Sequence, residues 1–348
     1  WKGGKCKYVS ARGYASALKG VEVQELEALS AVSVYANAEQ GLIDSGGAAR
    51  KRIVRLQKEL RSLPSQLEQN PNSTMWVRYD ADRPQFMRAV ITGPSGTPYE
   101  SGVFVFDLLF PLDYPQVPPK VTFLTTGGGT VRFNPNLYAD GKVCLSLLGT
   151  YDGPRWSPGG SLYQVLVSIQ GMILGVTHPI YNEPGLGGFE NQERGGGGHT
   201  WHVHSTAERC YDERVQTATI QFAILAHLRP DNLPAGFEQN VVRHFALKRG
   251  AIVHRLLHWT HEAEQYRKRH GVKGLNLDHL SNLKVLHSRL LTALATLQPP
   301  PAPEAAEDQD DSSLFSTQPP PNDNTPTSAG ADVSASAEGP VVGGSGCG

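Results

Sequence analysis

Apolar residues recur along the first half of the chain in patterns typical of one helix followed by several strands. Between Ile53 and Leu63 they repeat every three or four positions, which predicts an amphipathic helix over 48–63 that ends before Pro64. Four β-type runs follow, and the Gly- and Pro-containing loops between them predict an antiparallel meander. The apolar run 161–174 is predicted to be a core helix packed on this sheet. The predicted strands are 75–79, 86–91, 103–109 and 121–124.

The second half carries three more apolar stripes with helical spacing, over 211–225, 252–266 and 283–297. Such stripes are usually packing surfaces, so they predict a helical extension that packs on the sheet. The last segment is rich in Pro, Ser, Asp and Gly, which predicts a disordered tail. The N-terminal segment is poorly defined, although 21–38 has room for a short helix. The predicted organisation is therefore an N-terminal segment (1–47), a core domain (48–205), a helical extension (206–298) and a tail (299–348).

Composition restricts the class of protein without identifying a function. A chain of 348 residues with 39% hydrophobic content can bury one large core and a smaller appendage. The net charge of −1 gives no reason to expect a nucleic acid or an anionic membrane as partner, and no apolar run approaches the ~18 residues that span a bilayer. The four cysteines show no pairing pattern and no secretory signal is visible, which favours the cytoplasm, with the nucleus or the cytosolic face of endomembranes as further locations. Because the chain begins at Trp1, we expect a fragment of a longer protein.

The candidate chemistry is concentrated between residues 133 and 148. The turn signals Asn134-Pro135-Asn136 and Asp140-Gly141 predict that the chain doubles back before Cys144. The Cys144 thiol and the Asn136 amide, eight residues apart, could then face one pocket. A thiolate attacks acyl carbonyls and an amide N–H donates to the resulting oxyanion, so the pair indicates acyl transfer through a thioester. Taken alone, a single cysteine in an apolar run fits simple core packing as well.

The motifs around Cys144 resemble those of a known family. They are GPSGTPY at 93–99, GVFVF at 102–106, FPLDYP at 110–115, PPKV at 118–121, WSP at 156–158 and LVSIQ at 166–170. In this order they resemble the ubiquitin-conjugating enzyme family. With RFNPNLY at 132–138 and YNEPG at 181–185, the chain is most similar to the conjugating domain at the C-terminal end of the giant inhibitor-of-apoptosis proteins, and next to the large hybrid conjugating/ligase enzymes. The resemblance implies an α+β fold with an N-terminal helix, a four-stranded antiparallel meander, an active-site loop and a core helix, extended here by C-terminal helices.

The resemblance also implies roles for three residues. Cys144 matches the nucleophile that accepts ubiquitin from an ATP-dependent activating enzyme and passes it to lysines of protein substrates. Asn136 matches the asparagine on the oxyanion side, and it also fits a turn residue that caps its own loop. Glu183 matches an acidic gate residue that orients the incoming ammonium and takes its proton, with a solvated loop glutamate as the alternative. A free lysine has a pKa of about 10.4 and is almost entirely protonated at neutral pH. Desolvation in the cleft must therefore lower this pKa to supply the neutral amine. No cofactor is implied, and inhibition of apoptosis is implied by the similarity to the giant proteins alone.

Partner surfaces are predicted from the first helix and from one loop. The family uses the basic face of this helix to dock the activating enzyme, and the matching residues here are Arg52, Arg55 and Lys58. Gln116 stands where many members carry a phenylalanine that anchors ligases, which predicts an atypical ligase or a substrate-binding region within the chain itself. Asn134 stands where most members have histidine. Since that histidine is mainly a structural hydrogen-bonding residue, asparagine can replace it.

Two other interpretations were weighed. His199, His202, His204 and Cys210 are metal-ligating residue types, but they lack the spacing of a zinc site, so no metal site is predicted. A function of a different class is a non-catalytic module that keeps the fold to bind ubiquitin or a partner. The presence of Cys144 with Asn136 at the expected spacing favours the enzyme.

Overall fold

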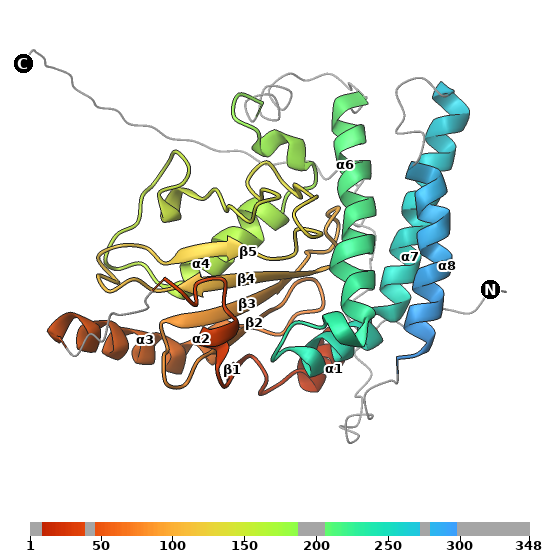
Figure 1. Ribbon diagram of the computed structural model, residues 1–348. Helices are drawn as coiled ribbons and strands as arrows, with labels where there is room; N and C mark the ends of the chain where they lie inside the picture. Colours follow the sequence, from red (N-terminus) through yellow and green to blue (C-terminus); the bar gives the residue numbers. More distant parts are fainter. Residues whose placement is uncertain (1–8, 39–45, 187–205, 272–278, 298–348) are drawn as a thin grey trace, which may run out of the picture. The chain divides into compact units, whose positions relative to one another are not determined.

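A five-stranded sheet is the centre of the computed structural model, which describes residues 9–38, 46–186, 206–271 and 279–297 (Figure 1). All described residues belong to one compact unit, Trp1–Glu304. The strands follow the order of the chain, and β2 to β5 form the predicted antiparallel meander. The α+β prediction is therefore confirmed. The strands are β1 (Val23–Glu25), β2 (Met75–Tyr79), β3 (Phe86–Thr92), β4 (Val103–Leu109) and β5 (Lys120–Phe123).

The N-terminal segment adds structure that the sequence patterns missed. It contains the helix α1 (Ala11–Ala17), the strand β1 and the short helix α2 (Leu29–Val32) in place of one helix over 21–38. β1 pairs in parallel with β2, and the amide of Val77 donates to the carbonyl of Glu22 at 2.8 Å. A strand of three residues has too little pattern to be recognised, because its conformation is set by the edge of β2 on which it pairs.

Two helices cover the first face of the sheet. The helix α3 (Gly47–Gln66) contributes Leu56 and Leu63 to a core with alternate residues of β2, β3 and β4. It continues through Pro64, beyond the predicted end: the proline lacks the one N–H that would donate to Leu60, and the amide of Leu67 still donates to the carbonyl of Leu63 at 3.1 Å. The helix α4 (Leu162–Ser168) passes into a wider turn, η2 (Ile169–Leu174), and begins with a capping box between Ser161 and Gln164.

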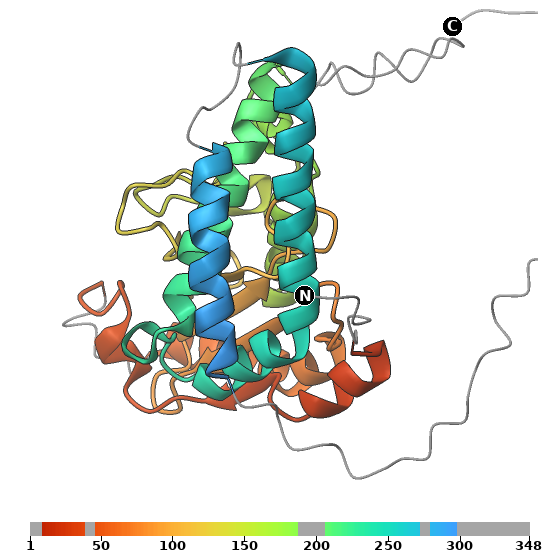
Figure 2. The same cartoon turned by 90° about the vertical axis from the view of Figure 1, so that its right-hand side faces the viewer.

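The helical extension consists of α6 (Thr206–Ala218) with its continuation η5 (Thr219–Leu225), α7 (Glu238–His270) and α8 (His279–Ala295). α7 and α8 cover the second face of the sheet, whereas α6 contributes Val215 and Ala218 to the core of the first face. Figure 2 shows α7 and α8 side by side, running in opposite directions. Sheet residues that alternate with those of the first core, among them Trp76, Val90 and Val103, pack with α7, α8 and Tyr14 of α1. Both faces of the sheet are therefore buried, and the extension is part of the packing of the core domain.

Buried polar groups fix the extension to the sheet. Arg78 of β2 is 1% exposed, and its Nε donates to the carbonyl of Gly236 at 2.7 Å. His244 of α7 lies between the hydroxyl of Tyr14 (2.7 Å from Nδ1) and the carbonyl of Ser101 (3.1 Å from Nε2). Burial lowers the pKa of His244 to about 3, so the ring is neutral at physiological pH. Because a carbonyl can only accept, Nε2 carries the proton and Nδ1 accepts from Tyr14.

We expect a chain that ends at residue 205 to lose cooperative unfolding. Its sheet would expose Trp76, Val90 and Val103, and each such side chain contributes about 1.5–3 kcal/mol when buried. This loss is comparable with the total stability of a typical domain, about 5–15 kcal/mol. Urea titration followed by tryptophan fluorescence checks the expectation. A chain that ends at Gln298 keeps both cores and is the control. A sharp transition of the short chain at the control's midpoint would show that the core domain folds alone.

Candidate active site

The loop between β5 and α4 carries Cys144, and local hydrogen bonds give it its shape. The Asn134 side chain accepts from the amide of Asn136 at 2.8 Å, and the amide of Lys142 donates to Asp140 Oδ1 at 3.0 Å. Gly141 has φ = +91°, and a Cβ there would lie 2.8 Å from the carbonyl oxygen of Phe123, so only glycine fits this turn. The two turns predicted from the sequence are therefore formed, and the chain doubles back before Cys144.

Cys144 and Asn136 are joined by two hydrogen bonds. The amide of Cys144 donates to the carbonyl of Asn136, and Nδ2 of Asn136 donates to the carbonyl of Cys144, each at 2.9 Å. Cys144 is not in a disulfide and is 5% exposed, and Asn136 is 8% exposed. An amide NH₂ has two hydrogens, so the bond to the Cys144 carbonyl leaves one N–H of Asn136 for another acceptor.

Asn134 connects this loop to neighbouring segments, and its side chain is fully buried. Its Nδ2 donates to the Tyr99 hydroxyl at 2.9 Å and to the carbonyl of Ile173 at 3.1 Å. Its Oδ1 accepts from the amide of Asn136 and from Nδ2 of Asn182, at 2.8 and 3.2 Å. All four hydrogen-bonding positions of the amide are used. An imidazole has two nitrogens, so histidine at this position could not make the same set of bonds.

Glu183 reaches the same loop through Arg132. It follows the short helix η3 (Pro179–Asn182), and its Oε2 lies 3.3 Å from Nη2 of Arg132. The same nitrogen donates to the carbonyl of Pro135 at 2.7 Å, and the guanidinium lies over the ring of Tyr138 at 4.3 Å. The Glu183 side chain is 42% exposed, so it is accessible to a partner molecule. The structure thus places Glu183 at the loop of Asn136, and its catalytic role stays a prediction.

Thr150 holds the backbone on both sides of Cys144, a contact that the sequence patterns did not reveal. Its hydroxyl donates to the carbonyl of Val143 at 2.7 Å and accepts from the amide of Leu145 at 3.0 Å. The left-handed Gly149 (φ = +69°) ends the turn of 3-10 helix before it. The loop 148–155 therefore returns to the segment that carries the cysteine.

The prediction that Arg52 belongs to an exposed basic face with Lys58 is wrong, whereas the partly exposed Arg55 lies at the edge of that face and its docking role stays a prediction. Arg52 is 5% exposed, and its Nη1 donates to the carbonyl of Phe110 at 3.0 Å. The Arg55 side chain is 27% exposed, and its Nη2 donates to the carbonyl of Gly160 at 2.6 Å. A helix turns by about 100° per residue, so Arg52 lies on the buried stripe of α3, about 120° around the helix from Lys58. The basic residues of α3 on the exposed side are Arg50, Lys51, Lys58 and Arg61.

The buried stripe of α3 also carries a charged residue, Glu59. It accepts from the Tyr114 hydroxyl at 2.5 Å, from Nε of Arg55 at 2.5 Å and from the amide of Leu162 at 2.8 Å. The Leu162 amide is one of the unpaired donors at the start of α4, where a carboxylate is favoured. Glu59 therefore joins α3, α4 and the loop before β5. Its position three residues after Leu56 could have indicated burial from the sequence.

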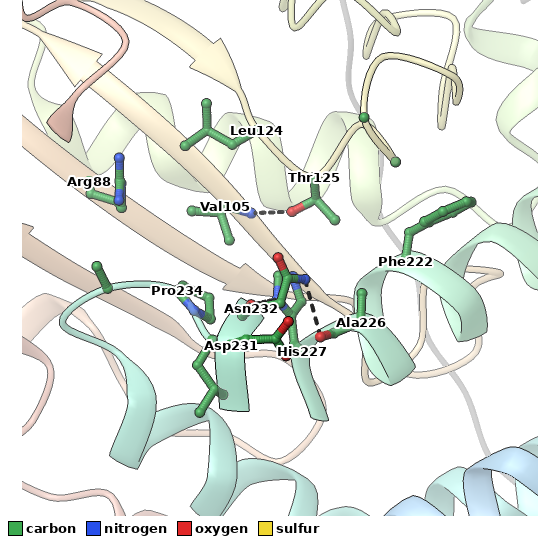
Figure 3. A pocket seen from close by; sticks show the side chains of 14 residues that line it. Arg88, Val105, Leu124, Thr125, Phe222, Ala226, His227, Asp231, Asn232 and Pro234 are labelled. Carbon is green, nitrogen blue, oxygen red and sulfur yellow. Dashed lines mark hydrogen bonds between the residues drawn. The ribbon is translucent and has the colours of Figure 1, made fainter. Parts of the chain in front are cut away.

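A cavity of about 480 Å³ lies on the second face of the sheet, and Cys144 is not among the residues that line it (Figure 3). Figure 3 shows Val105 and Leu124 on one side and Phe222 and His227 of the extension on the other. Two of its polar side chains bond within the chain: Asn232 Nδ2 donates to the carbonyl of Ala226 at 3.1 Å, and Asp231 pairs with Arg229. No thiol lines this cavity, so it is not a candidate for the thioester chemistry.

Neither metal-binding clusters nor membrane-spanning helices occur in the part of the chain that the structure describes. No group of three or more His, Cys, Asp or Glu side chains there could hold a metal ion. His199, His202 and His204 lie outside the described residues. No described helix combines the length and the apolar character needed to cross a bilayer.

Comparisons with known proteins agree with the resemblance. The family described as "Ubiquitin-conjugating enzyme" matches residues 55–185. The probable ubiquitin-conjugating enzyme protein 17 of Caenorhabditis elegans is 38% identical over 269 residues, which cover 74% of this chain and 35% of that protein. The human dual E2 ubiquitin-conjugating enzyme/E3 ubiquitin-protein ligase BIRC6 is 39% identical over 268 residues, or 76% of this chain and 5% of that protein. Ubiquitin-conjugating enzyme E2 Z of Xenopus tropicalis is 34% identical over 281 residues, which cover 78% of this chain and 83% of the frog protein.

We expect Asn134→Ala to lower the free energy of unfolding by about 2–4 kcal/mol, because it leaves the Asn136 amide and the Ile173 carbonyl buried without their partner. Urea titration of both proteins measures the change. The control is Asn72→Ala, an exposed asparagine for which we expect a change within about 0.5 kcal/mol. Equal midpoints for Asn134→Ala and the parent chain would mean that the buried amide does not stabilise the loop.

Proposed function

Because this chain belongs to the ubiquitin-conjugating enzyme family, we propose that Cys144 carries ubiquitin as a thioester and transfers it to an amine. The observation that supports the proposal best is the pair of hydrogen bonds that join Cys144 and Asn136. They hold an amide donor beside the backbone of the only cysteine in the loop, with one N–H still available. This arrangement suits an acyl group on sulfur, whose carbonyl oxygen becomes negative during transfer.

The first transfer exchanges one thioester for another. The Cys144 thiolate attacks the carbonyl carbon of the ubiquitin C-terminus, which arrives as a thioester of the activating enzyme. The bond to the activating enzyme's sulfur breaks, and that sulfur leaves as a thiolate, so the reaction needs no cofactor on this chain. Since Cys144 is 5% exposed, the acyl donor must be a narrow chain end. A free thiol is required, which fits a reducing compartment such as the cytoplasm.

The second transfer forms the amide bond with a substrate lysine. Its neutral amine attacks the thioester carbonyl, the oxyanion forms, and the carbon–sulfur bond breaks to restore the Cys144 thiolate. We propose that the remaining N–H of Asn136 donates to the oxyanion. The amine must lose a proton as it reacts, and Glu183, accessible beside Arg132, is the proposed acceptor. Burial of the lysine in the cleft favours the neutral amine before attack.

We propose that the activating enzyme docks on the exposed basic side of α3. Lys51 and Arg61 join Lys58 in this proposal in place of the buried Arg52, and the partly exposed Arg55 lies at the edge of the surface. Surface charges of one sign attract a partner of opposite sign over about 8 Å at physiological salt. Charging should therefore slow as salt rises.

The proposal covers the conjugating step alone. The name of the human relative assigns it both conjugating and ligase activity, and the chain spans 5% of that protein. Substrate choice, a ligase activity and a role in apoptosis belong to the whole protein and remain predictions from the resemblance. Gln116 is exposed next to Val117, so this loop offers a ligase no aromatic side chain, which favours an atypical ligase or a substrate region elsewhere in the protein.

The proposed nucleophile is tested by charging with activating enzyme, ATP and ubiquitin, followed by a non-reducing gel. We expect a thiol-sensitive adduct with the parent chain, an alkali-sensitive oxyester or no adduct with Cys144→Ser, and none with Cys144→Ala. Asn136→Ala should charge nearly normally and discharge to free lysine about 10²–10³ times more slowly. Cys210→Ser is the control and should charge like the parent chain. A thiol-sensitive adduct on Cys144→Ala would place the nucleophile elsewhere.

The proposed docking surface is tested by reversing Lys51 and Lys58 to glutamate. We expect slower charging, with an unchanged rate of discharge from a thioester formed beforehand, because docking concerns the first transfer alone. The matched control reverses Arg12 and Lys19, exposed residues of the N-terminal segment, and makes the same change in net charge. If the two double variants charge at equal rates, α3 is not part of the docking surface.

A further inference from the structure

Two carboxylates of the helical extension contact the segment that leads to Glu183. His178 directly precedes η3, and its Nδ1 lies 2.7 Å from Asp212 Oδ2 and 3.1 Å from Glu208 Oε1, both on α6. The Tyr181 hydroxyl donates to Glu208 Oε2 at 3.1 Å. The two carboxylate side chains are 14% and 7% exposed, so water screens these contacts little. α6 therefore holds the residue before η3 and Tyr181 within it.

The C-terminal half of η3 contacts the support of the active-site loop. Nδ2 of Asn182 donates to Asn134 Oδ1 at 3.2 Å and to the carbonyl of Met172 at 3.1 Å. The same Oδ1 of Asn134 accepts from the amide of Asn136, whose side chain bonds to Cys144. The backbone of η3 thus connects the hydrogen bonds made by α6 to those that reach the loop of the nucleophile.

The helix η3 has four residues and cannot hold this position by itself. A 3-10 turn of this length has few backbone bonds of poor geometry, so side-chain contacts at its two ends decide where it lies. α6 is well placed to provide them, because Val215 and Ala218 pack in the same core as α4 and the active-site loop. A rigid helix then transmits its position through His178 and Tyr181.

We infer, resting on the proposed function, that Asp212 and Glu208 are positioning residues for transfer to lysine: by holding His178 and Tyr181, they fix Asn182 and hence the Asn134–Asn136 turn beside Cys144. In this view the extension, beyond covering the sheet, orients the oxyanion donor. The first transfer depends less on them, because the activating enzyme adds its own contacts to the reacting thioester.

The test compares charging with discharge of the purified full chain. We expect Asp212→Ala to slow discharge to free lysine about 3- to 10-fold, the effect of one lost hydrogen bond on a rate, while charging stays within about twofold. In an Asn136→Ala background the same substitution should have no further effect, because the group that it positions is gone. Asp212→Asn keeps the acceptor oxygen and should recover most of the rate.

Two controls separate positioning from general damage. Asp231→Ala removes a carboxylate from an exposed ion pair of the extension with Arg229, and discharge should be unchanged. Tyr181→Phe removes only the hydroxyl that donates to Glu208, so it decides the question if Asp212→Ala does not fold. We expect it to slow discharge in the parent chain and not in Asn136→Ala.

The possible results have distinct meanings. A parent chain that forms no thiol-sensitive adduct would reject the proposed function together with this inference. If the parent charges and both Asp212→Ala and Tyr181→Phe discharge at its rate, the inference fails and the proposed function stands. An equal loss with and without Asn136 would also overturn the inference, because the carboxylates would then act by another route.

Discussion

The buried amide of Asn134 is the contact on which the active-site loop depends. It is fully buried and uses two donors and two acceptor positions, on Tyr99, Ile173, Asn136 and Asn182. A buried polar group is stable only when each hydrogen-bonding position finds a partner, so these four segments must meet in one arrangement. The loop of Cys144 is thereby fixed relative to the sheet, to the turn η2 and to η3. Because removal of one partner leaves others unsatisfied, the site is sensitive to changes that do not touch the thiol.

The burial of both sheet faces joins the extension to the conjugating core. Alternate strand residues pack either with α3 and α4 or with α7, α8 and α1, so neither set of helices is an optional addition. The second face also carries an ion pair. Arg88 donates two hydrogen bonds of 2.5 and 3.0 Å to the fully buried Asp107, which the N-terminal segment also contacts. A buried ion pair is tolerated only when its remaining hydrogen-bonding positions are satisfied, and the Val34 amide donates to Asp107 at 2.9 Å.

Helix α3 shows how a charged residue can belong to the core. Glu59 and Arg52 lie on its buried stripe and bond to groups of other elements, and Arg55 borders it. This face joins α3 to the start of α4 and to the loop before β5. The exposed side, with Lys51 and Lys58, is left for a partner. One helix therefore connects the interior and the proposed docking surface, with the division set by the helical period.

The sequence by itself determined the meander, the helices α3, α4, α6, α7 and α8, and the loop of Cys144, because strand alternation, helical spacing and turn residues are local patterns. The membership of the family followed from ordered motifs. It did not reveal β1, since three residues become a strand only beside β2. Nor did it show that Arg52 is buried, because a basic residue on a helix can point to water or to a carbonyl such as that of Phe110. The hydrogen bonds of Asn134 and of the α6 carboxylates join residues that are distant along the chain. Those of Thr150 join residues within an irregular loop. Only the tertiary structure could decide them, because no periodicity relates such positions, and packing alone brings them into hydrogen-bonding distance.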